Sequence, residues 1–244
     1  MIEIRNLKKS FDDLLVWENV SFNIEDSETV AIIGRSGCGK SVLIKHINAL
    51  LCPDEGEVIL DGDNVHELPY IQQRKLRQRF GILFQGSALF DSINTFENIA
   101  FPLRYFTNKT ENEIRDEVEE VLDLVRLHGV GEKQTSELSG GMRKRVGIAR
   151  AIILRPEYLM YDEPTSGLDP RTADEINELI IRMAEKLCIT SIVVTHDMHS
   201  VLKISDKVAF LDQQKLSWFG ETEDMKHADH EELREFIKAS EYQI

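Results

Sequence analysis

The sequence has few cysteines and no long apolar run, and each absence excludes a class of protein. Cysteine occurs three times in 244 residues, at Cys38, Cys52 and Cys188, with no CxxC pair. An odd and scattered set of this kind indicates reduced thiols rather than a disulfide framework or a zinc site. No apolar run approaches the roughly 18 residues that a bilayer-spanning helix needs. A membrane role would therefore have to come through a partner chain.

Positive charge is also in the minority. The chain carries 29 Lys and Arg against 43 Asp and Glu, a formal net charge of −14. Because affinity for a phosphate backbone grows with the Lys and Arg presented on a surface, this balance excludes a non-specific nucleic-acid binder. The first ten residues, MIEIRNLKKS, alternate like a strand and lack the apolar segment of a signal peptide. We expect a cytosolic chain that holds any anion at a local site.

The distribution of apolar residues predicts an α/β protein. Alternating β-like runs fill most of the first thirty residues, and compact apolar runs typical of buried strands occur at TVAII, GILF, EYLMY, TSIVV and KVAFL. From Asn94 to about Arg155 the pattern is helical almost throughout. The sequence therefore predicts a catalytic core at 1–86 and 156–220 with a helical subdomain, 87–155, inserted between. An acidic, helix-prone extension, 221–244, follows. Its pattern leaves open whether it stabilises a dimer or frays.

The strongest local motif is GRSGCGKS, residues 34–41, which satisfies G-x-x-x-x-G-K-[ST] between a strand and a helical run. Its glycines allow successive backbone N–H groups to face phosphate oxygens, and the helix N-terminus adds its dipole. Lys40 would reach the β- and γ-phosphates, and Ser41 would offer a hydroxyl to Mg²⁺. The flanking strand and helix disfavour the alternative, a tight glycine turn with an exposed lysine.

A second motif, EYLMYDEP, places Asp162 and Glu163 at the carboxyl end of an apolar strand, the edge where parallel sheets bind ligands. We predict that Asp162 holds Mg²⁺ through its hydration shell and that Glu163 orients or deprotonates the attacking water. An isolated Asp-Glu pair is usually a solvated loop, but together with a P-loop it indicates a Walker B element. Gln85 and His196 also follow apolar strands, and each could point at the γ-phosphate. Either residue alone is more often part of a surface or a turn.

Residues 138–146, LSGGMRKRV, are a third candidate for binding an anion. Ser139 is a good helix N-cap, and the Gly-Gly pair after it opens a helical run with free N–H groups. We expect the cations Arg143, Lys144 and Arg150 to stay accessible on the flank of this helix. Two phosphate sites in one domain make sense if each ATP is shared between the P-loop of one chain and the LSGG segment of another.

The order of GRSGCGKS, Gln85, LSGGM, LMYDEP, SGLD and His196 closely resembles the nucleotide-binding subunits of ABC transporters, over about residues 1–220. The resemblance implies a P-loop NTPase (RecA-like) core, an N-terminal antiparallel β-subdomain and an inserted α-helical subdomain. It also implies ATP and Mg²⁺ as cofactors, hydrolysis of ATP to ADP and phosphate, and a head-to-tail homodimer with two ATP molecules at the interface.

The same resemblance assigns roles to single residues. It implies that Lys40, Gln85, Glu163 and His196 take part in catalysis, and that Asp169 of SGLD communicates between the two sites. It implies three metal-binding residues, which are Ser41, Gln85 and Asp162. The nucleotide-binding residues that it implies are Phe11, Val16, Gly34, Arg35, Ser36, Gly37, Cys38, Gly39, Lys40, Ser41, Val42, Ser139, Gly140 and Gly141. Phe11 would stack on adenine, although an ordinary half-buried strand aromatic gives the same pattern.

Two departures narrow the subfamily. Many relatives have Gln where this chain has Met142, and many have Thr or Ser where it has Val42; neither change removes a group that the chemistry requires. The segments SGGMRKRVGIARAI, KSVLIKHI and FQGSALFDSINTFENIAFPLR look most like ATPases of lipid-trafficking ABC systems of the Mla or Mce type.

That likeness implies phospholipid transport with a membrane permease and an MCE-domain lipid-binding protein, no nucleic-acid partner, and a peripheral place on the cytoplasmic side of the inner membrane. The helical insert would contact the permease. The ATPase of a solute importer, or of an efflux or lipoprotein-release system, stays open as an alternative. A non-transport ABC protein acting on DNA or the ribosome is less favoured.

Overall fold

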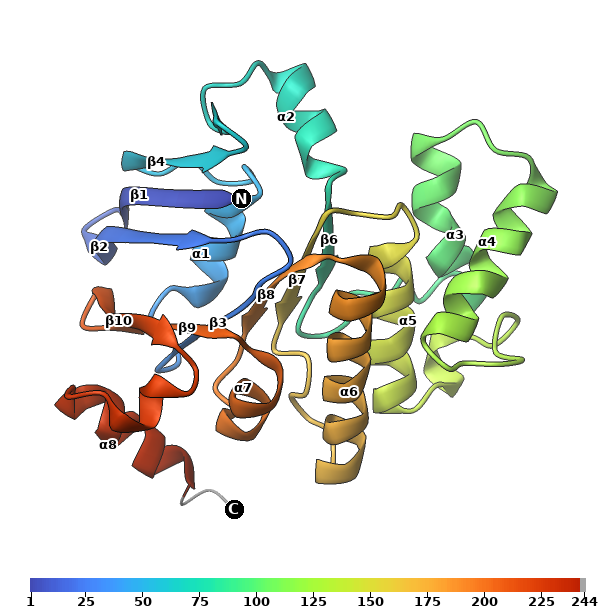
Figure 1. The fold of residues 1–244 in the computed structure, drawn as a ribbon. Coiled ribbons are helices and arrows are strands. Elements are labelled where there is room, and N and C mark those ends of the chain that lie inside the picture. Colours follow the sequence, from blue (N-terminus) through green and yellow to red (C-terminus); the bar gives the residue numbers. More distant parts are fainter. Residues whose placement is uncertain (242–244) are drawn as a thin grey trace.

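Two sheets organise the chain in the computed structural model, which describes residues 1–241 (Figure 1). The antiparallel sheet has the order β2-β1-β4-β5, and the larger sheet has the order β10-β9-β3-β8-β7-β6. In the larger sheet, β9, β3, β8, β7 and β6 run parallel and β10 is an antiparallel edge strand. The strands are β1 (Ile2–Phe11), β2 (Leu14–Ile24), β3 (Thr29–Gly34), β4 (Glu55–Leu60), β5 (Asp63–Asn64), β6 (Phe80–Leu83), β7 (Tyr158–Asp162), β8 (Thr190–Val194), β9 (Lys207–Asp212) and β10 (Lys215–Glu221).

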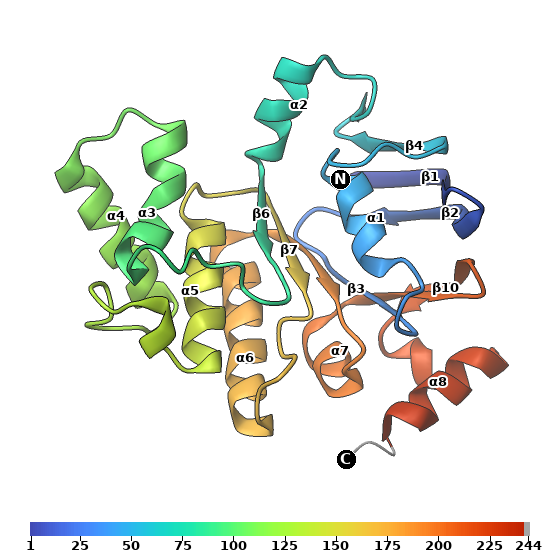
Figure 2. The same cartoon turned by 180° about the vertical axis from the view of Figure 1, so that it is seen from behind.

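The helices lie beside these sheets, with α3 and α4 at one side of the molecule and the antiparallel strands at the other (Figures 1 and 2). They are α1 (Lys40–Ile47), α2 (Tyr70–Arg77), α3 (Thr95–Phe106), α4 (Glu111–Leu124), α5 (Gly140–Ile152), α6 (Pro170–Leu187), α7 (Met198–Ile204) and α8 (Glu231–Glu241), with short 3-10 turns η1 (Thr135–Glu137) and η2 (Asp224–His227). The predicted α/β architecture with an inserted helical block is confirmed. The sequence analysis did not anticipate β10 or α7.

Side-chain caps fix where four of the long helices begin. Asn94, Thr110, Ser139 and Asp169 each accept a hydrogen bond from a backbone N–H in the first turn of α3, α4, α5 and α6. Such caps satisfy N–H groups that have no partner inside the helix. At α4 the cap is reciprocal, because Glu113 accepts from the backbone N–H of Thr110. The helix boundaries are thus encoded locally in the sequence.

Apolar packing joins the inserted and N-terminal parts to the catalytic sheet. One buried cluster surrounds α1 and connects the two sheets; it includes Trp17, Ile44 and Ile192. A second cluster connects the insert to β7 and α6, and it includes Val118 and Ile148. Because burial of apolar area is the dominant favourable term in folding, the parts that interrupt each other in sequence are held together as one body around the sheet.

The acidic extension is also folded onto the core. Leu233 is 0% exposed and Ile237 is 8% exposed, and both share a cluster with Phe210 of β9 and Val201 of α7. Figure 1 shows α8 beside β10, at the edge of the larger sheet. The extension is therefore packed against the core through Leu233 and Ile237 rather than frayed, and its last residues, 242–244, lie outside the described part.

No helix among residues 1–241 combines the length and the apolar character that crossing a bilayer requires.

Candidate functional site

The strand order brings the predicted motifs to one edge of the larger sheet. β3, β8, β7 and β6 are neighbours and run parallel, so their carboxyl ends lie side by side. The P-loop follows β3, His196 follows β8, Asp162 and Glu163 stand at the end of β7, and Gln85 follows β6. Two cavities of 470 and 280 Å³ open at this edge, and the two share Ser36, Lys40, Gln85 and Glu163. Residues as far apart in the sequence as Gly34 and His196 therefore form one site.

The P-loop takes a conformation that depends on glycine. Gly39, which precedes α1, has φ of +93°, and a Cβ there would lie 2.4 Å from Cγ1 of Val16 and 2.7 Å from the indole of Trp17. The Trp17 indole N–H lies 3.5 Å from the Gly39 carbonyl oxygen. Val16, a predicted nucleotide-binding residue, thus lies against the loop. Trp17 supports the loop from the core, a role that the sequence motifs did not reveal.

Lys40 lies inside the curve of the loop. Its Nζ donates to the carbonyl oxygens of Gly34 at 2.9 Å and Arg35 at 3.0 Å, and the residue is buried. Cys38 is half-buried, and burial raises the pKa of its thiol. The thiol is therefore kept protonated, which suits a structural role in the loop rather than that of a nucleophile.

Ser41 and Asp162 form an oxygen-rich pair. The Ser41 hydroxyl lies 3.2 Å from Oδ2 and 3.3 Å from Oδ1 of Asp162. The pKa of Asp162 is raised, mainly by burial, and the Ser41 hydrogen bond and the charges of Lys40 and Lys144 only partly oppose this rise. Hydroxyl, carboxylate and amide oxygens are the ligands that Mg²⁺ prefers, with waters and phosphate oxygens completing its shell. The side chains here, with Gln85 on the wall of both cavities, fit that metal.

Glu163 and His196 are in direct contact. The Oε1 atom of Glu163 lies 2.9 Å from Nδ1 of His196, and the Glu163 backbone N–H donates to the carbonyl of Val194 on β8. Its other carboxylate oxygen, Oε2, is buried and has no hydrogen-bond partner among the described residues. A buried acceptor of this kind is normally satisfied by water or a ligand, so the carboxylate is suited to hold a water molecule in the cavity.

Other predicted residues lie away from these cavities. Phe11, at the end of β1, is 43% exposed, and the ammonium of Lys9 lies 5.4 Å from its ring centroid. Residues 139–141 stand at the start of α5, where the Ser139 hydroxyl accepts from the Met142 backbone N–H, and none of them lines either cavity. Asp169 caps α6. One chain thus assembles the P-loop side of the site and leaves its LSGG segment elsewhere.

The prediction that Lys144 stays accessible is wrong. Lys144 is 5% exposed, and its Nζ donates to the backbone carbonyls of Gln85 at 2.5 Å and Glu163 at 2.8 Å. Helical spacing could have revealed this, because Lys144 stands four and eight residues before the buried Ile148 and Ile152. Arg150, also predicted to be accessible, is half-buried and donates to the carbonyls of residues 87 and 88.

Helix α8 borders the larger cavity. Glu235, Phe236, Ala239 and Ser240 line it opposite the P-loop and His196. The sequence analysis did not foresee this contact, because nothing in the acidic tail marks the side that would face the P-loop. The extension therefore contributes to the walls of the site as well as to the core.

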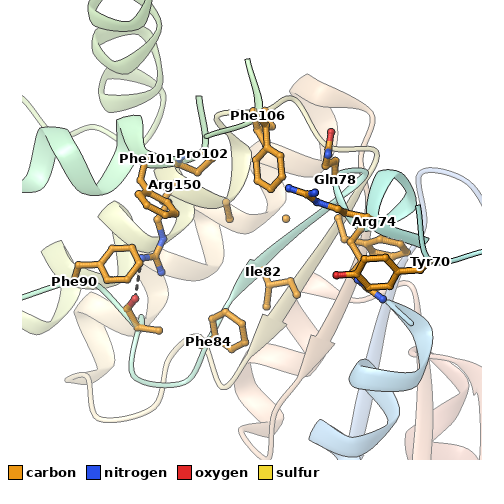
Figure 3. Close-up of a pocket in the computed structure, with 16 residues that line it drawn as sticks. Tyr70, Arg74, Gln78, Ile82, Phe84, Phe90, Phe101, Pro102, Phe106 and Arg150 are labelled. Carbon is orange, nitrogen blue, oxygen red and sulfur yellow. Dashed lines mark hydrogen bonds between the residues drawn. The ribbon is translucent and has the colours of Figure 1, made fainter. Parts of the chain in front are cut away.

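A separate groove of 660 Å³ lies between α2, β6, α3 and α5 (Figure 3). Its walls carry aromatic rings, among which Phe90, Phe101 and Phe106 are 43%, 44% and 41% exposed. The guanidinium groups of Arg74 and Arg150 reach into the same groove, and that of Arg150 lies 5.8 Å from the Phe90 ring centroid. Partly exposed aromatic rings gathered in a concave surface are typical of an interaction site.

Comparison with known proteins agrees with this geometry. A family model described as ABC transporter matches residues 17–166. The MlaF ATP-binding protein of an intermembrane phospholipid transport system in Haemophilus influenzae is 40% identical, over 98% of this chain and 90% of its own length. The methionine import ATP-binding protein MetN of Clostridium tetani is 40% identical, over 99% and 76%. The probable ribonucleotide transport ATP-binding protein mkl of Mycobacterium leprae is also 40% identical, over 97% and 68%.

A solved structure extends the comparison to the fold. The ATP-binding cassette MJ0796, in a dimeric post-hydrolysis state bound to ADP and Pi, superposes with a TM-score of 0.83 at 29% identity, covering 91% of this chain and 99% of that one. The match of the family model, the fold and the ordered motifs agree. The chain belongs to the ABC transporter family and is an ATP-hydrolysing cassette of that family, with ATP and Mg²⁺ as its cofactors.

Proposed function

We propose that the residues at the carboxyl edge of the larger sheet divide the work of ATP hydrolysis in this chain. Lys40 and the P-loop N–H groups bind the β- and γ-phosphates, and Ser41, Asp162 and Gln85 hold Mg²⁺, which would neutralise charge on those phosphates. Glu163 orients or deprotonates the attacking water, and His196 fixes the Glu163 carboxylate. The observation that carries these assignments is that four strand ends converge on two cavities, and that the side chains named above all line one or both of them.

We also propose that two copies of the chain close head to tail on two ATP molecules. The exclusion of residues 139–141 from the P-loop cavities supports this arrangement, because a helix N-terminus with a Gly-Gly opening is suited to hold an anion supplied from another chain. The dimeric cassette MJ0796 with bound ADP and Pi supports it as well. In this dimer Ser139, Gly140 and Gly141 would contact the γ-phosphate, and Asp169 would communicate between the sites.

The aromatic groove is our candidate for the surface that binds a membrane permease. It lies between the catalytic core and the helical insert, so a segment seated there touches both α2 and α5. A bound segment could therefore move α5 relative to the P-loop, which would couple the permease to closure of the dimer. In this scheme the chain works at the cytoplasmic face of the inner membrane, held there by its partner.

For the transported substrate we propose phospholipid, with an MCE-domain lipid-binding protein as a further partner. The similarity to MlaF along almost the whole of both chains supports this choice. Import of a small solute is the second candidate, because the methionine import protein MetN has the same 40% identity to this chain. Co-purification from membranes followed by mass spectrometry of proteins and lipids separates the two: an MCE-domain protein and phospholipid support the first, and a solute-binding protein supports the second.

The assignment of Glu163 is tested by Glu163→Gln. We expect this variant to bind ATP, to lose nearly all turnover, by about a hundredfold or more, and to accumulate as a nucleotide-bound dimer on size-exclusion chromatography. Glu157→Gln is the matched control, because it makes the same chemical change at the residue just before β7, at the end of the strand away from Glu163. Glu157 pairs with Arg79 on the surface, so this variant should leave turnover unchanged. Undiminished hydrolysis by Glu163→Gln would refute the assignment.

A further inference from the structure

Helix α5 touches both the LSGG segment and the catalytic loops of its own chain. Its first turn begins at Gly140, after the Ser139 cap, and its next turn carries Lys144. The side chain of Lys144 reaches the loops after β6 and β7, which are adjacent strands. The same helix therefore connects the segment proposed to meet a partner's ATP with the residues proposed to act on this chain's own ATP.

The ammonium of Lys144 holds two main-chain carbonyls. It donates to Gln85 at 2.5 Å and to Glu163 at 2.8 Å. The Glu163 carbonyl also accepts from the backbone N–H of Ser166 at 3.3 Å, and Glu163 itself has φ of +51°, a conformation that side-chain-bearing residues rarely adopt. Lys144 thus stabilises an unusual backbone geometry at the residue proposed to position water.

Burying a lysine is unfavourable unless its charge is compensated. Burial lowers the pKa of Lys144, and the nearby carboxylates of Glu163 and Asp162 raise it. Neither carboxylate is hydrogen-bonded to Nζ; both of its hydrogen bonds in the described residues go to carbonyl oxygens. A side chain that only filled space beside Ile148 could be apolar, so the ammonium is better explained by what it holds in place.

We propose that Lys144 is a positioning residue for ATP hydrolysis, which sets the loops of Gln85 and Glu163 through their backbone carbonyls and ties them to α5. This inference rests on the proposed roles of Gln85 and Glu163. It also gives the signature helix a direct mechanical connection to its own catalytic loop: when α5 shifts as the dimer closes, Lys144 carries the two carbonyls with it. Binding at the LSGG segment would then influence turnover at the P-loop of the same chain.

The decisive variant is Lys144→Met, which keeps a long flexible side chain and removes the ammonium. ATP affinity of the P-loop should change by about twofold at most, because both hydrogen bonds of the Lys144 ammonium in the described residues go to carbonyls outside the P-loop. The kcat should fall by about tenfold to a hundredfold, as expected for a small misplacement of reacting groups. Cooperativity with ATP should weaken, so that the Hill coefficient falls toward one. Lys144→Arg, which keeps the charge and the N–H donors, should recover part of kcat.

Lys207→Met is the matched control, since Lys207 also ties two segments together, through Glu28, but stands at the start of β9, away from the carboxyl edge. If Lys144→Met is too unstable to assay, Lys144→Leu, which also lacks N–H donors, carries the same comparison. A kcat of Lys144→Met within about twofold of the unsubstituted chain would overturn the proposal. It would also be overturned if Lys144→Met and Lys207→Met lowered the melting temperature equally and lost ATP affinity and kcat to the same extent, because the loss would then reflect stability alone. Retained turnover by Glu163→Gln would instead contradict the roles on which the proposal rests.

Discussion

Replacement of Leu233 by alanine tests whether the C-terminal extension belongs to the folded core. The Leu233 side chain on α8 is 0% exposed and packs in the cluster that contains Phe210 and Val201. The substitution removes three carbon atoms, and at about 0.8 kcal/mol for each buried CH₂ this loses about 2.4 kcal/mol. A residual cavity increases the loss, so the free energy of unfolding should fall by about 2–5 kcal/mol.

The assay is urea unfolding followed by circular dichroism, with nucleotide absent and protein concentration fixed, because ligand or subunit binding would raise the apparent stability. For a chain of this size, a loss of about 2.4 kcal/mol corresponds to a fall in melting temperature of about 5–10 °C. Leu202→Ala is the matched control. Leu202 lies on α7 and is 41% exposed, so its replacement should change the free energy of unfolding by about 0.5 kcal/mol at most.

A loss below about 1 kcal/mol for Leu233→Ala would refute the reasoning, since a buried leucine in a packed core does not give so small an effect. That result would indicate that α8 detaches from β9 and α7 in solution. The wall of the larger P-loop cavity that is formed by Glu235, Phe236, Ala239 and Ser240 would then be absent as well. Stability of the extension and shape of the site are therefore tested together.

Two further predictions concern pH and the signature segment. Burial, followed by repulsion from His46, lowers the pKa of His66 to about 4 from its ordinary value of 6.5. The contribution of the neutral imidazole to stability is therefore full above pH 6.5 and is lost as the pH falls toward 4. In His66→Leu the free energy of unfolding should vary less steeply with pH between these two values, and an unchanged slope would contradict the lowered pKa. Met142→Gln should leave ATPase activity within about twofold of the unsubstituted chain. Met142 donates its backbone N–H to the Ser139 hydroxyl, and glutamine retains that N–H. A tenfold change in activity would show that the Met142 side chain has a role of its own.

Several features could be predicted from sequence because their causes are local. The P-loop is one, since a glycine pattern between a strand and a helix specifies the backbone shape itself, and Gly39 with φ of +93° fits that demand. The caps at Ser139 and Asp169 are also local, because they depend on a side chain and an N–H three residues away. The placing of Gln85 and His196 at the carboxyl edge of the sheet followed from a topological rule, that residues after parallel strands gather at one edge, whereas their roles came only from the family resemblance.

Other features depend on packing between distant segments. The sequence displays Lys144 within a run of cations, and only the seating of α5 against β6 and the loops of Gln85 and Glu163 buries its ammonium. Likewise, the acidic composition of 221–241 does not indicate that Leu233 is buried in the same apolar cluster as Phe210. Helical spacing can place a residue on the buried side of a helix, but the groups that it meets there are supplied by distant parts of the chain.

The sequence by itself thus determined the family and the α/β fold, and it predicted which residues bind phosphate and metal, because these depend on short motifs with fixed spacing. The tertiary structure alone decided which loops the buried Lys144 holds, that α8 borders the larger P-loop cavity, and that the LSGG segment lies outside both P-loop cavities of its own chain. The physical reason is that a motif consists of residues close together in the sequence, whereas contacts between distant segments arise from strand order and apolar packing in the folded chain.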